Sequence, residues 1–270
     1  MGIQKEIKKH KTIALLAPSF ATEFEYPKII GQLKELGFDK VVELTFGAKM
    51  INRDYHKILK KSSGLVISSV CPGITSFVKQ KYPEFEKNLI KVDSPMIATG
   101  KICKKFYPKH KTCFISPCNF KKQEALGNID YVIDYQELKN LIRGISLKNK
   151  SHCLDKFYND YTKVYPLSGG LSKTAHLKNV IKPSQSKIVD GVLEVEKFLK
   201  EYKNNKHKEI KFLDVTFCKG GCIGGPFLSS KNIKENKKKL MKYLTIAKKE
   251  KIPCEDLGLI KRAKGIKFTH

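Results

Sequence analysis

The sequence predicts an α/β fold in which mainly parallel, twisted sheets are flanked by helices. Short apolar and β-branched runs alternate along the chain with segments of helical periodicity, which is the pattern typical of this class. The chain has 270 residues, 41% of them hydrophobic, which is enough to bury a full core. Because no low-complexity linker divides it, we expect one globular unit or two closely packed lobes.

The expected strands are short and rich in apolar and β-branched side chains, and they cover residues 12–16, 40–44, 65–69, 112–116, 131–134, 187–189 and 211–217. Helices are expected between them. One apolar stripe runs from Ile29 to Leu36 and stops at Gly37, and another runs from Ile51 to Leu59. Residues 146–165 lack periodicity and are predicted to form a loop that crosses between a lobe of residues 1–145 and a lobe of residues 166–270.

The net charge of +27 raises the question of nucleic-acid binding. Only three of the 53 basic residues are arginine, whereas base and phosphate recognition relies on the bidentate arginine fork. The lysines are spread over almost every segment, which favours a lysine-rich solvated surface over a nucleic-acid site. Attraction of an acidic protein or an acidic membrane surface remains a second interpretation.

The first apolar run covers only residues 13–18, which is too short for a signal sequence or a membrane span. The sequence therefore predicts a cytoplasmic protein without a membrane span. Eight cysteines in an intracellular chain argue against a disulfide scaffold and for metal binding or redox chemistry by some of them.

Three cysteines follow predicted strands, where the carboxyl ends of parallel strands gather ligands. Cys71, Cys118 and Cys218 occupy these places, and Cys222 lies four residues after Cys218. Four converging thiolates suit zinc or an iron-sulfur cluster. Because the C-x2-C pairs of structural zinc sites are absent, the spacing favours a cluster held between lobes.

Three segments also share their order and spacing with a known family. "SSVCPGITSFVKQKYPEF" resembles the first signature of the catalytic domain of FeFe-hydrogenases, "SPCNFKKQE" resembles the second, and "CKGGCIGGP" resembles the third. "LLAPSF", "SPMIATG" and "SGGLSKTA" are weaker matches to other family segments. Together they extend from about residue 17 to 226, so the resemblance covers most of the chain.

The resemblance implies that Cys71, Cys118, Cys218 and Cys222 bind a 4Fe-4S cluster. Cys222 would also bridge this cluster to a 2Fe unit that carries CO, cyanide and azadithiolate ligands, the two parts together forming the H-cluster. The other residues implied as cofactor contacts are Ala17, Pro18, Ser19, Pro95, Met96, Pro117, Lys121, Gly220, Gly221 and Gly224.

Within this set, Cys222, Lys121, Ser19 and Pro18 are the residues expected to act in catalysis. Lys121 would donate a hydrogen bond to a cyanide ligand, with Glu124 as its neighbour, and Ser19 would bond another cyanide. The glycines would let the backbone approach a bulky inorganic group.

Several positions depart from the family pattern. Val70 stands where the family has a proton-passing cysteine, Ser116 and Met96 replace a methionine and a glutamine, and the third motif is shorter by two residues. Asp54 corresponds only loosely to a glutamate of the family's proton route. The accessory ferredoxin-like domains of the family do not appear in the sequence, so the resemblance implies a minimal form.

The implied function is reversible reduction of protons to H2, with electrons from a ferredoxin or a similar acidic carrier and with dedicated maturation proteins that supply the 2Fe unit. Valine cannot carry a proton, so Val70 predicts slow turnover or another proton path. The alternative is a non-catalytic relative, either an H2 sensor or an iron-sulfur assembly-type protein with only a 4Fe-4S cluster. A nucleic-acid binder with a structural cluster is a third, less favoured interpretation.

Four further cysteines match no motif and are interpreted as small apolar residues or incidental thiols: Cys103, Cys113, Cys153 and Cys254.

Overall fold

The computed structural model describes residues 3–147, 153–155, 161–177, 180–247 and 263–270. Its first sheet has the strand order β2-β1-β4-β5 and is parallel throughout. The strands are β1 (Thr12–Leu16), β2 (Lys40–Glu43), β4 (Lys111–Ser116) and β5 (Tyr131–Asp134). The second sheet has the order β3-β7-β6 and is also parallel, with β3 (Val66–Ile67), β6 (Ser186–Asp190) and β7 (Phe212–Thr216).

The predicted α/β class with parallel sheets is therefore confirmed, and every expected strand is present, although β3 is reduced to two residues. The helices are α1 (Ile3–Lys9), α2 (Lys28–Leu36), α3 (Thr45–Lys61), α4 (Pro72–Lys81), α5 (Pro95–Phe106), α6 (Asn119–Glu124), α7 (Tyr135–Ile142), α8 (Gly170–Thr174), α9 (Val192–Lys203) and α10 (Ile233–Ala247). Short 3-10 turns include η1 (Pro18–Thr22), η2 (Pro83–Asn88), η3 (Tyr161–Val164), η5 (Pro183–Gln185) and η6 (Cys222–Gly224).

Local sequence signals explain where the helices begin and end. α2 stops at Gly37, whose φ of +112° closes the helix in a conformation that residues with a Cβ rarely adopt. α7 begins with a capping box, in which Asp134 accepts the amide of Glu137 and the Glu137 carboxylate accepts the amide of Asp134. α3 begins at Thr45, six residues before the apolar stripe that predicted it, because Thr45, Phe46 and Met50 are also buried.

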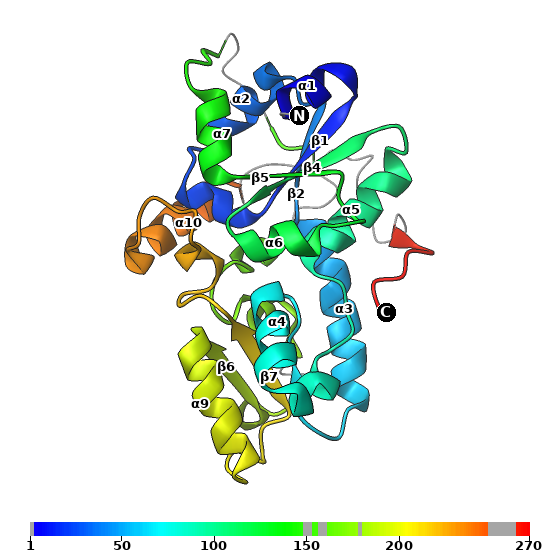
Figure 1. Ribbon diagram of the computed structural model, residues 1–270, viewed down its shortest axis with the longest axis vertical. Helices are drawn as coiled ribbons and strands as arrows, with labels where there is room; N and C mark the ends of the chain where they lie inside the picture. Colours follow the sequence, from blue (N-terminus) through cyan, green and yellow to red (C-terminus); the bar gives the residue numbers. More distant parts are fainter. Residues whose placement is uncertain (1–2, 148–152, 156–160, 178–179, 248–262) are drawn as a thin grey trace.

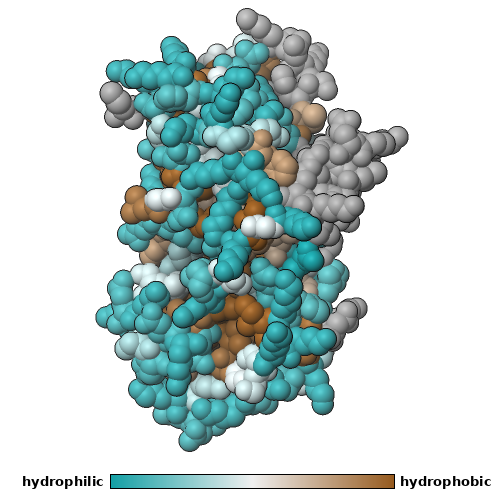
Figure 2. Space-filling model, turned by 90° about the vertical axis from the view of Figure 1, so that its right-hand side faces the viewer, coloured by the Kyte–Doolittle hydropathy of each residue, from teal (hydrophilic) through white to brown (hydrophobic). Residues whose placement is uncertain are grey.

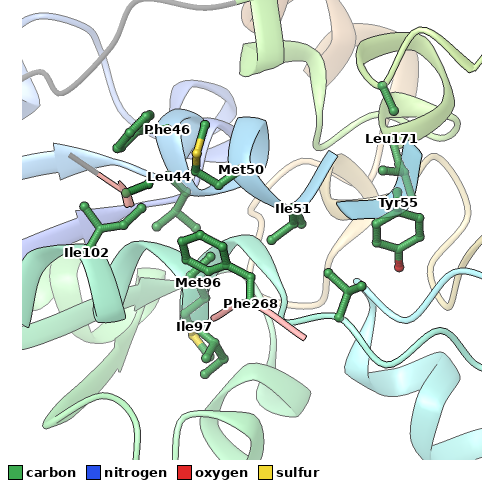
Figure 3. Packing of buried hydrophobic residues seen from close by; sticks show 14 of the residues in the cluster. Leu44, Phe46, Met50, Ile51, Tyr55, Met96, Ile97, Ile102, Leu171 and Phe268 are labelled. Atoms are coloured by element: carbon green, nitrogen blue, oxygen red, sulfur yellow. The ribbon is translucent and has the colours of Figure 1, made fainter. Parts of the chain in front are cut away.

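The two sheets form the upper and lower parts of an elongated molecule (Figure 1), and α3 extends from the lower edge of the first sheet down beside the second. The apolar core against α3 includes Leu44, Met50, Ile51 and Tyr55, and Figure 3 shows Met96 and Phe268 close to this row of side chains. A second core packs α2, α7 and α10 against the first sheet, and a third packs α4 and α9 against the second sheet.

The lobes do not follow the division at residues 146–165 that the sequence suggests. β3 belongs to the second sheet although it lies in the first third of the chain. α10, near the carboxyl end, returns to the first lobe, where Leu240 and Tyr243 pack beside Phe20. Parallel sheets allow this because strands that are far apart in sequence pair only after folding. Part of the expected crossing loop lies outside the described residues, and residues 161–164 of it form η3.

The outer surface is dominated by hydrophilic side chains, as Figure 2 shows for one face, with apolar side chains visible only between them. This agrees with the expected lysine-rich solvated surface. None of the helices in the described part of the chain is long and apolar enough to cross a membrane.

A buried ion pair connects three distant segments of the first lobe. Lys163 in η3 contacts the carboxylate of Glu43 at the end of β2, and both side chains are almost fully buried. Tyr243 of α10 completes the cluster, since its hydroxyl lies 2.8 Å from Glu43 Oε1 and 3.0 Å from Lys163 Nζ. Within the described residues, the charges of Lys163 and Glu43 compensate each other, so the cluster fixes how these segments meet.

Removing one charge of this cluster is therefore expected to destabilise the fold strongly. We expect Lys163→Met to lower the free energy of unfolding by about 3–5 kcal/mol, because Glu43 is left buried without its cation. The double variant Glu43→Gln with Lys163→Met is expected to recover more than half of this loss. Urea unfolding of the metal-free protein measures both, and Lys239→Met, which removes an exposed pair with Glu235, is the control with an effect of less than about 1 kcal/mol. An equal effect of the two lysine variants would contradict this interpretation.

Candidate metal centre

The four cysteines singled out by the sequence all lie just beyond the carboxyl ends of strands. Cys71 follows β3 and is the residue before α4, Cys118 follows β4 and is the residue before α6, and Cys218 and Cys222 follow β7. β4 belongs to the first sheet, whereas β3 and β7 are neighbours in the second. The cysteines therefore come from both lobes and approach one another where the lobes meet.

Electrostatic coupling shows how closely the four thiols gather. In each of the six pairs that these four thiols form, a negative charge on one sulfur raises the pKa of the other. Burial, together with this like-charge effect, raises the pKa of Cys218 to about 11 and raises the pKa of Cys118 and of Cys222 as well. Thiolates need a cation in such a place, so the arrangement suits a positively charged metal group.

The spacing distinguishes between kinds of metal group. Within the described residues, no three His, Cys, Asp or Glu side chains are close enough together to hold a single metal ion. A tetrahedral zinc ion with Zn–S bonds of about 2.3 Å would require its sulfurs to lie within roughly 4 Å of one another. A larger iron-sulfur cluster separates its cysteines more widely, so the four coupled thiols fit a cluster better than zinc.

A cavity with mainly apolar walls adjoins three of the thiols. Its lining includes Cys71, Cys118 and Cys222. Six of the other predicted cofactor contacts also line it: Ala17, Pro18, Pro95, Met96, Pro117 and Lys121. Apolar walls exclude water and strengthen the few polar contacts inside.

Lys121 contributes a positively charged ammonium group to the cavity lining, and two oxygen atoms of the protein accept hydrogen bonds from it. Its Nζ donates to Glu124 Oε2 at 2.6 Å and to the Val70 carbonyl oxygen at 3.3 Å. Burial by itself would lower the pKa of Lys121, but Glu124, Cys118 and Cys222 raise that pKa overall. The side chain therefore remains a cation beside the thiols.

Ser19 and the glycines do not line the cavity. The hydroxyl of Ser19 is buried and lies 2.8 Å from the Tyr135 hydroxyl, so it is already partnered. Gly220, Gly221 and Gly224 form the turn that presents Cys222, and Cys218 lies at its start. The prediction that these residues contact a cofactor stays a prediction.

The structure gives the glycines a packing reason of their own. Gly221 has a φ of +78°, and a Cβ on it would lie 2.5 Å from the Pro166 carbonyl oxygen. The same oxygen accepts the amide of Cys222 at 2.8 Å, and Ser168 donates its amide to Gly220. The Cys222 turn is thus clamped backbone to backbone against the "SGG" segment, which leaves no room for side chains.

Several polar residues that the sequence analysis did not select also line the cavity, among them Asp214 and Tyr165. Asp214 lies in the strand that leads to Cys218, four residues before it, so inspection of the strand-end positions could have found it. Tyr165 precedes the "SGG" segment and carries no local sequence signal.

The other four cysteines either do not line this cavity or lie outside the described residues. Cys103 and Cys113 are fully buried in the apolar cores, as expected, and Cys153 is exposed. Cys254 lies outside the described residues.

The parallel α/β fold of this chain is similar to that of solved FeFe-hydrogenases. One solved FeFe-hydrogenase structure, described in connection with oxygen inactivation through the 2Fe subcluster, has a TM-score of 0.77 and is 15% identical in sequence. The match covers 97% of this chain and 93% of that one. A variant of FeFe-hydrogenase HydA1 from Chlamydomonas reinhardtii has a TM-score of 0.74 at 15% identity, and the match covers 96% of this chain and 92% of that one.

The family profile described as "Iron only hydrogenase large subunit, C-terminal domain" matches residues 10–226, and the chain belongs to this family. Iron hydrogenase 1 of Clostridium pasteurianum is 25% identical over 269 aligned positions, which span 77% of this chain and 47% of that protein. The cytosolic Fe-S cluster assembly factor NAR1 of Kluyveromyces lactis is 30% identical over 42% of this chain and 26% of its own length. The chain thus spans about half or less of these two relatives.

The four thiols together predict which cysteines bind iron. After anaerobic reconstitution with iron and sulfide, we expect Cys71→Ala, Cys118→Ala and Cys218→Ala each to lose most of the bound iron, because the cluster loses one of its four ligands. Iron analysis and the visible absorption of the cluster measure this. Cys153→Ser, which removes an exposed thiol, is the matched control and keeps full iron content. Undiminished iron in any of the three alanine variants would contradict the ligand assignment.

The raised thiol pKa values also predict how pH affects the metal-free protein. A thiol whose pKa is raised by folding stabilises the fold below its unfolded value of about 8.5, and this contribution is lost as pH rises toward the folded value. With a folded pKa of about 11 for Cys218 and a higher one for Cys222, the free energy of unfolding is expected to fall between pH 8.5 and 11. Urea unfolding across this range measures the slope. Cys222→Ser should show a shallower slope than the wild type, and identical slopes would contradict this account.

Proposed function

We propose that this chain binds an H-cluster and catalyses the reversible reduction of protons to H2. The observation that carries the proposal has two parts. Four thiols lie close enough to influence one another's ionisation, and an apolar cavity beside them contains the ammonium group of Lys121. Four thiols suit a 4Fe-4S cluster, and the cavity beside Cys222 suits a second group attached through that sulfur. The family membership and the clostridial iron hydrogenase among its relatives support the same function.

The chain's own residues would bind and shield this cofactor. The 2Fe unit, with its CO, cyanide and azadithiolate ligands, would supply the redox and proton chemistry when bound. Cys71, Cys118, Cys218 and Cys222 would bind the 4Fe-4S cluster, with Cys222 shared between the two parts. Lys121 would donate to a cyanide, and its neighbour Glu124 keeps its Nζ in place at 2.6 Å.

The remaining walls would position the cofactor and exclude water. Ala17, Pro18, Pro95, Met96 and Pro117 line the cavity with apolar surface, so the few polar contacts within it act at low dielectric. Met96 is fully buried in the core against α3, which limits its movement. Electrons would arrive in the cytoplasm from a ferredoxin or another acidic carrier attracted by the lysine-rich surface, and maturation proteins would supply the 2Fe unit.

A second candidate function follows from Val70, which lines the cavity where a proton-passing thiol is expected. Together with the likeness to the cytosolic Fe-S cluster assembly factor NAR1, this residue favours a non-catalytic relative, either an H2 sensor or a protein with the 4Fe-4S cluster alone. The apolar cavity favours the hydrogenase, because its lining extends from the thiols to Ala17, Pro18 and Pro95, which a 4Fe-4S cluster by itself would not need.

Infrared spectroscopy distinguishes these functions. After anaerobic maturation, we expect the wild type to show CO and cyanide stretching bands and to evolve H2 from a reduced dye. Lys121→Met is expected to keep its 4Fe-4S iron but to lose most of these bands, because the cavity then lacks its cationic donor. Cys153→Ser serves as the control and behaves as the wild type. Bands without H2 would contradict the catalytic proposal and favour a sensor, and the absence of bands would favour the assembly-type protein.

A further inference from the structure

Asp214 is a buried carboxylic acid without a cationic partner at hydrogen-bonding distance. It lies in β7 with 2% of its surface exposed and lines the cavity beside Cys222. Ser172 donates its backbone amide to Asp214 Oδ2 at 2.9 Å, and this is the single hydrogen bond of the carboxyl group within the described residues. The other carboxyl oxygen, Asp214 Oδ1, is therefore available to a group bound in the cavity.

Two hydroxyl groups near this acid also lack partners. The Tyr165 hydroxyl is inaccessible and makes no hydrogen bond within the described residues, although it lies within electrostatic reach of Asp214 and Cys222. The Ser172 hydroxyl lies beside the carboxyl group without meeting the geometry of a hydrogen bond. Buried polar groups normally find partners, so several of them around one acid indicate a site where hydrogen bonds change during function.

The buried position of Asp214 favours its protonated form. Burial raises the pKa of Asp214, while the Ser172 amide and the more distant Lys173 oppose this shift only in part. From α3, Tyr55 faces the same carboxyl group, and its hydroxyl is engaged by Ser69. A carboxyl group whose pKa is raised in this way keeps its proton to a higher pH than a solvated one and can release it to a nearby base.

Neither of the two positions that correspond to the family's proton route can pass a proton to this cavity. Val70 lines it but has no exchangeable proton. Asp54, the loose counterpart of a family glutamate, lies outside the lining and is paired with Lys57 at 3.0 Å. If the proposed reaction occurs, another group must bring the proton to the bound cofactor.

We propose that Asp214 is the proton-carrying residue of this cavity and that Tyr165 is its positioning partner. This inference rests on the proposed function. Asp214 Oδ1 would hold the proton and give it up to a basic atom of the group bound in the cavity, and the carboxylate left behind would accept hydrogen bonds from the Ser172 amide and from the Tyr165 hydroxyl. A proton from solvent water then restores the acid, so each turnover consumes protons from solvent and leaves Asp214 unchanged.

The protonated acid is testable before any 2Fe unit is installed. Infrared difference spectra of the 4Fe-4S protein at neutral pH are expected to contain the carbonyl stretch of a protonated carboxyl group, which shifts in D2O. Asp214→Asn, which can still accept the Ser172 amide, removes this band, and Tyr165→Phe shifts it. Asp54→Asn is the matched control and leaves it unchanged. A band that persists in Asp214→Asn, or that is missing from the wild type, overturns the inference.

The matured protein then tests the role in turnover. We expect Asp214→Asn to retain the CO and cyanide bands but to evolve H2 at least about 100-fold more slowly, the lower range of what a positioned acid contributes. The rate should become insensitive to pH in the range where the wild type titrates, while Asp54→Asn keeps the wild-type rate and profile. Equal rates for the two variants overturn the inference and leave the proposed function standing. A wild type without CO and cyanide bands overturns the proposed function, and the role of Asp214 with it.

Discussion

The structure depends on the burial of four thiols close to one another. Thiol groups are tolerated there as weakly polar side chains, but thiolates repel one another and cannot be solvated, so burial and like charge raise the pKa values of Cys118, Cys218 and Cys222. A metal cluster reverses this balance, because its positive charge stabilises the thiolates that the protein by itself disfavours. The site is thus arranged so that folding and metal binding favour opposite protonation states of the same sulfurs.

The two lobes supply this site because of how parallel sheets end. β4 of the first sheet and β3 and β7 of the second all present their carboxyl ends at the contact between the lobes, and each is followed by one of the cysteines. The position of Cys222 depends further on the backbone clamp between Gly221 and Pro166. The backbone contacts of this clamp are therefore as important for the geometry of the site as the four cysteines themselves.

The cavity combines an apolar lining with very few polar groups. Lys121 is a cation fixed by Glu124, and Asp214 is a carboxylic acid whose Oδ1 makes no hydrogen bond within the described residues, so the cavity offers a fixed positive charge and a carboxyl group that can exchange a proton. This separation of roles suits a cofactor that binds through anionic ligands and exchanges protons elsewhere on its surface. It also explains how a chain with Val70 in place of a thiol can remain compatible with proton chemistry.

The sequence alone determined the α/β class, the strands and the set of four cysteines, since hydrophobic periodicity and spacing are local properties of the chain. It could not assign β3 to the second sheet or α10 to the first lobe, because strand pairing and helix packing depend on contacts between distant segments. For the same reason Ser19 was expected at the cavity, although its hydroxyl is taken by Tyr135, which lies 116 residues away in sequence. Only the tertiary structure placed Asp214 and Tyr165 on the cavity wall, because burial and the absence of a hydrogen-bond partner exist only once the lobes have packed together.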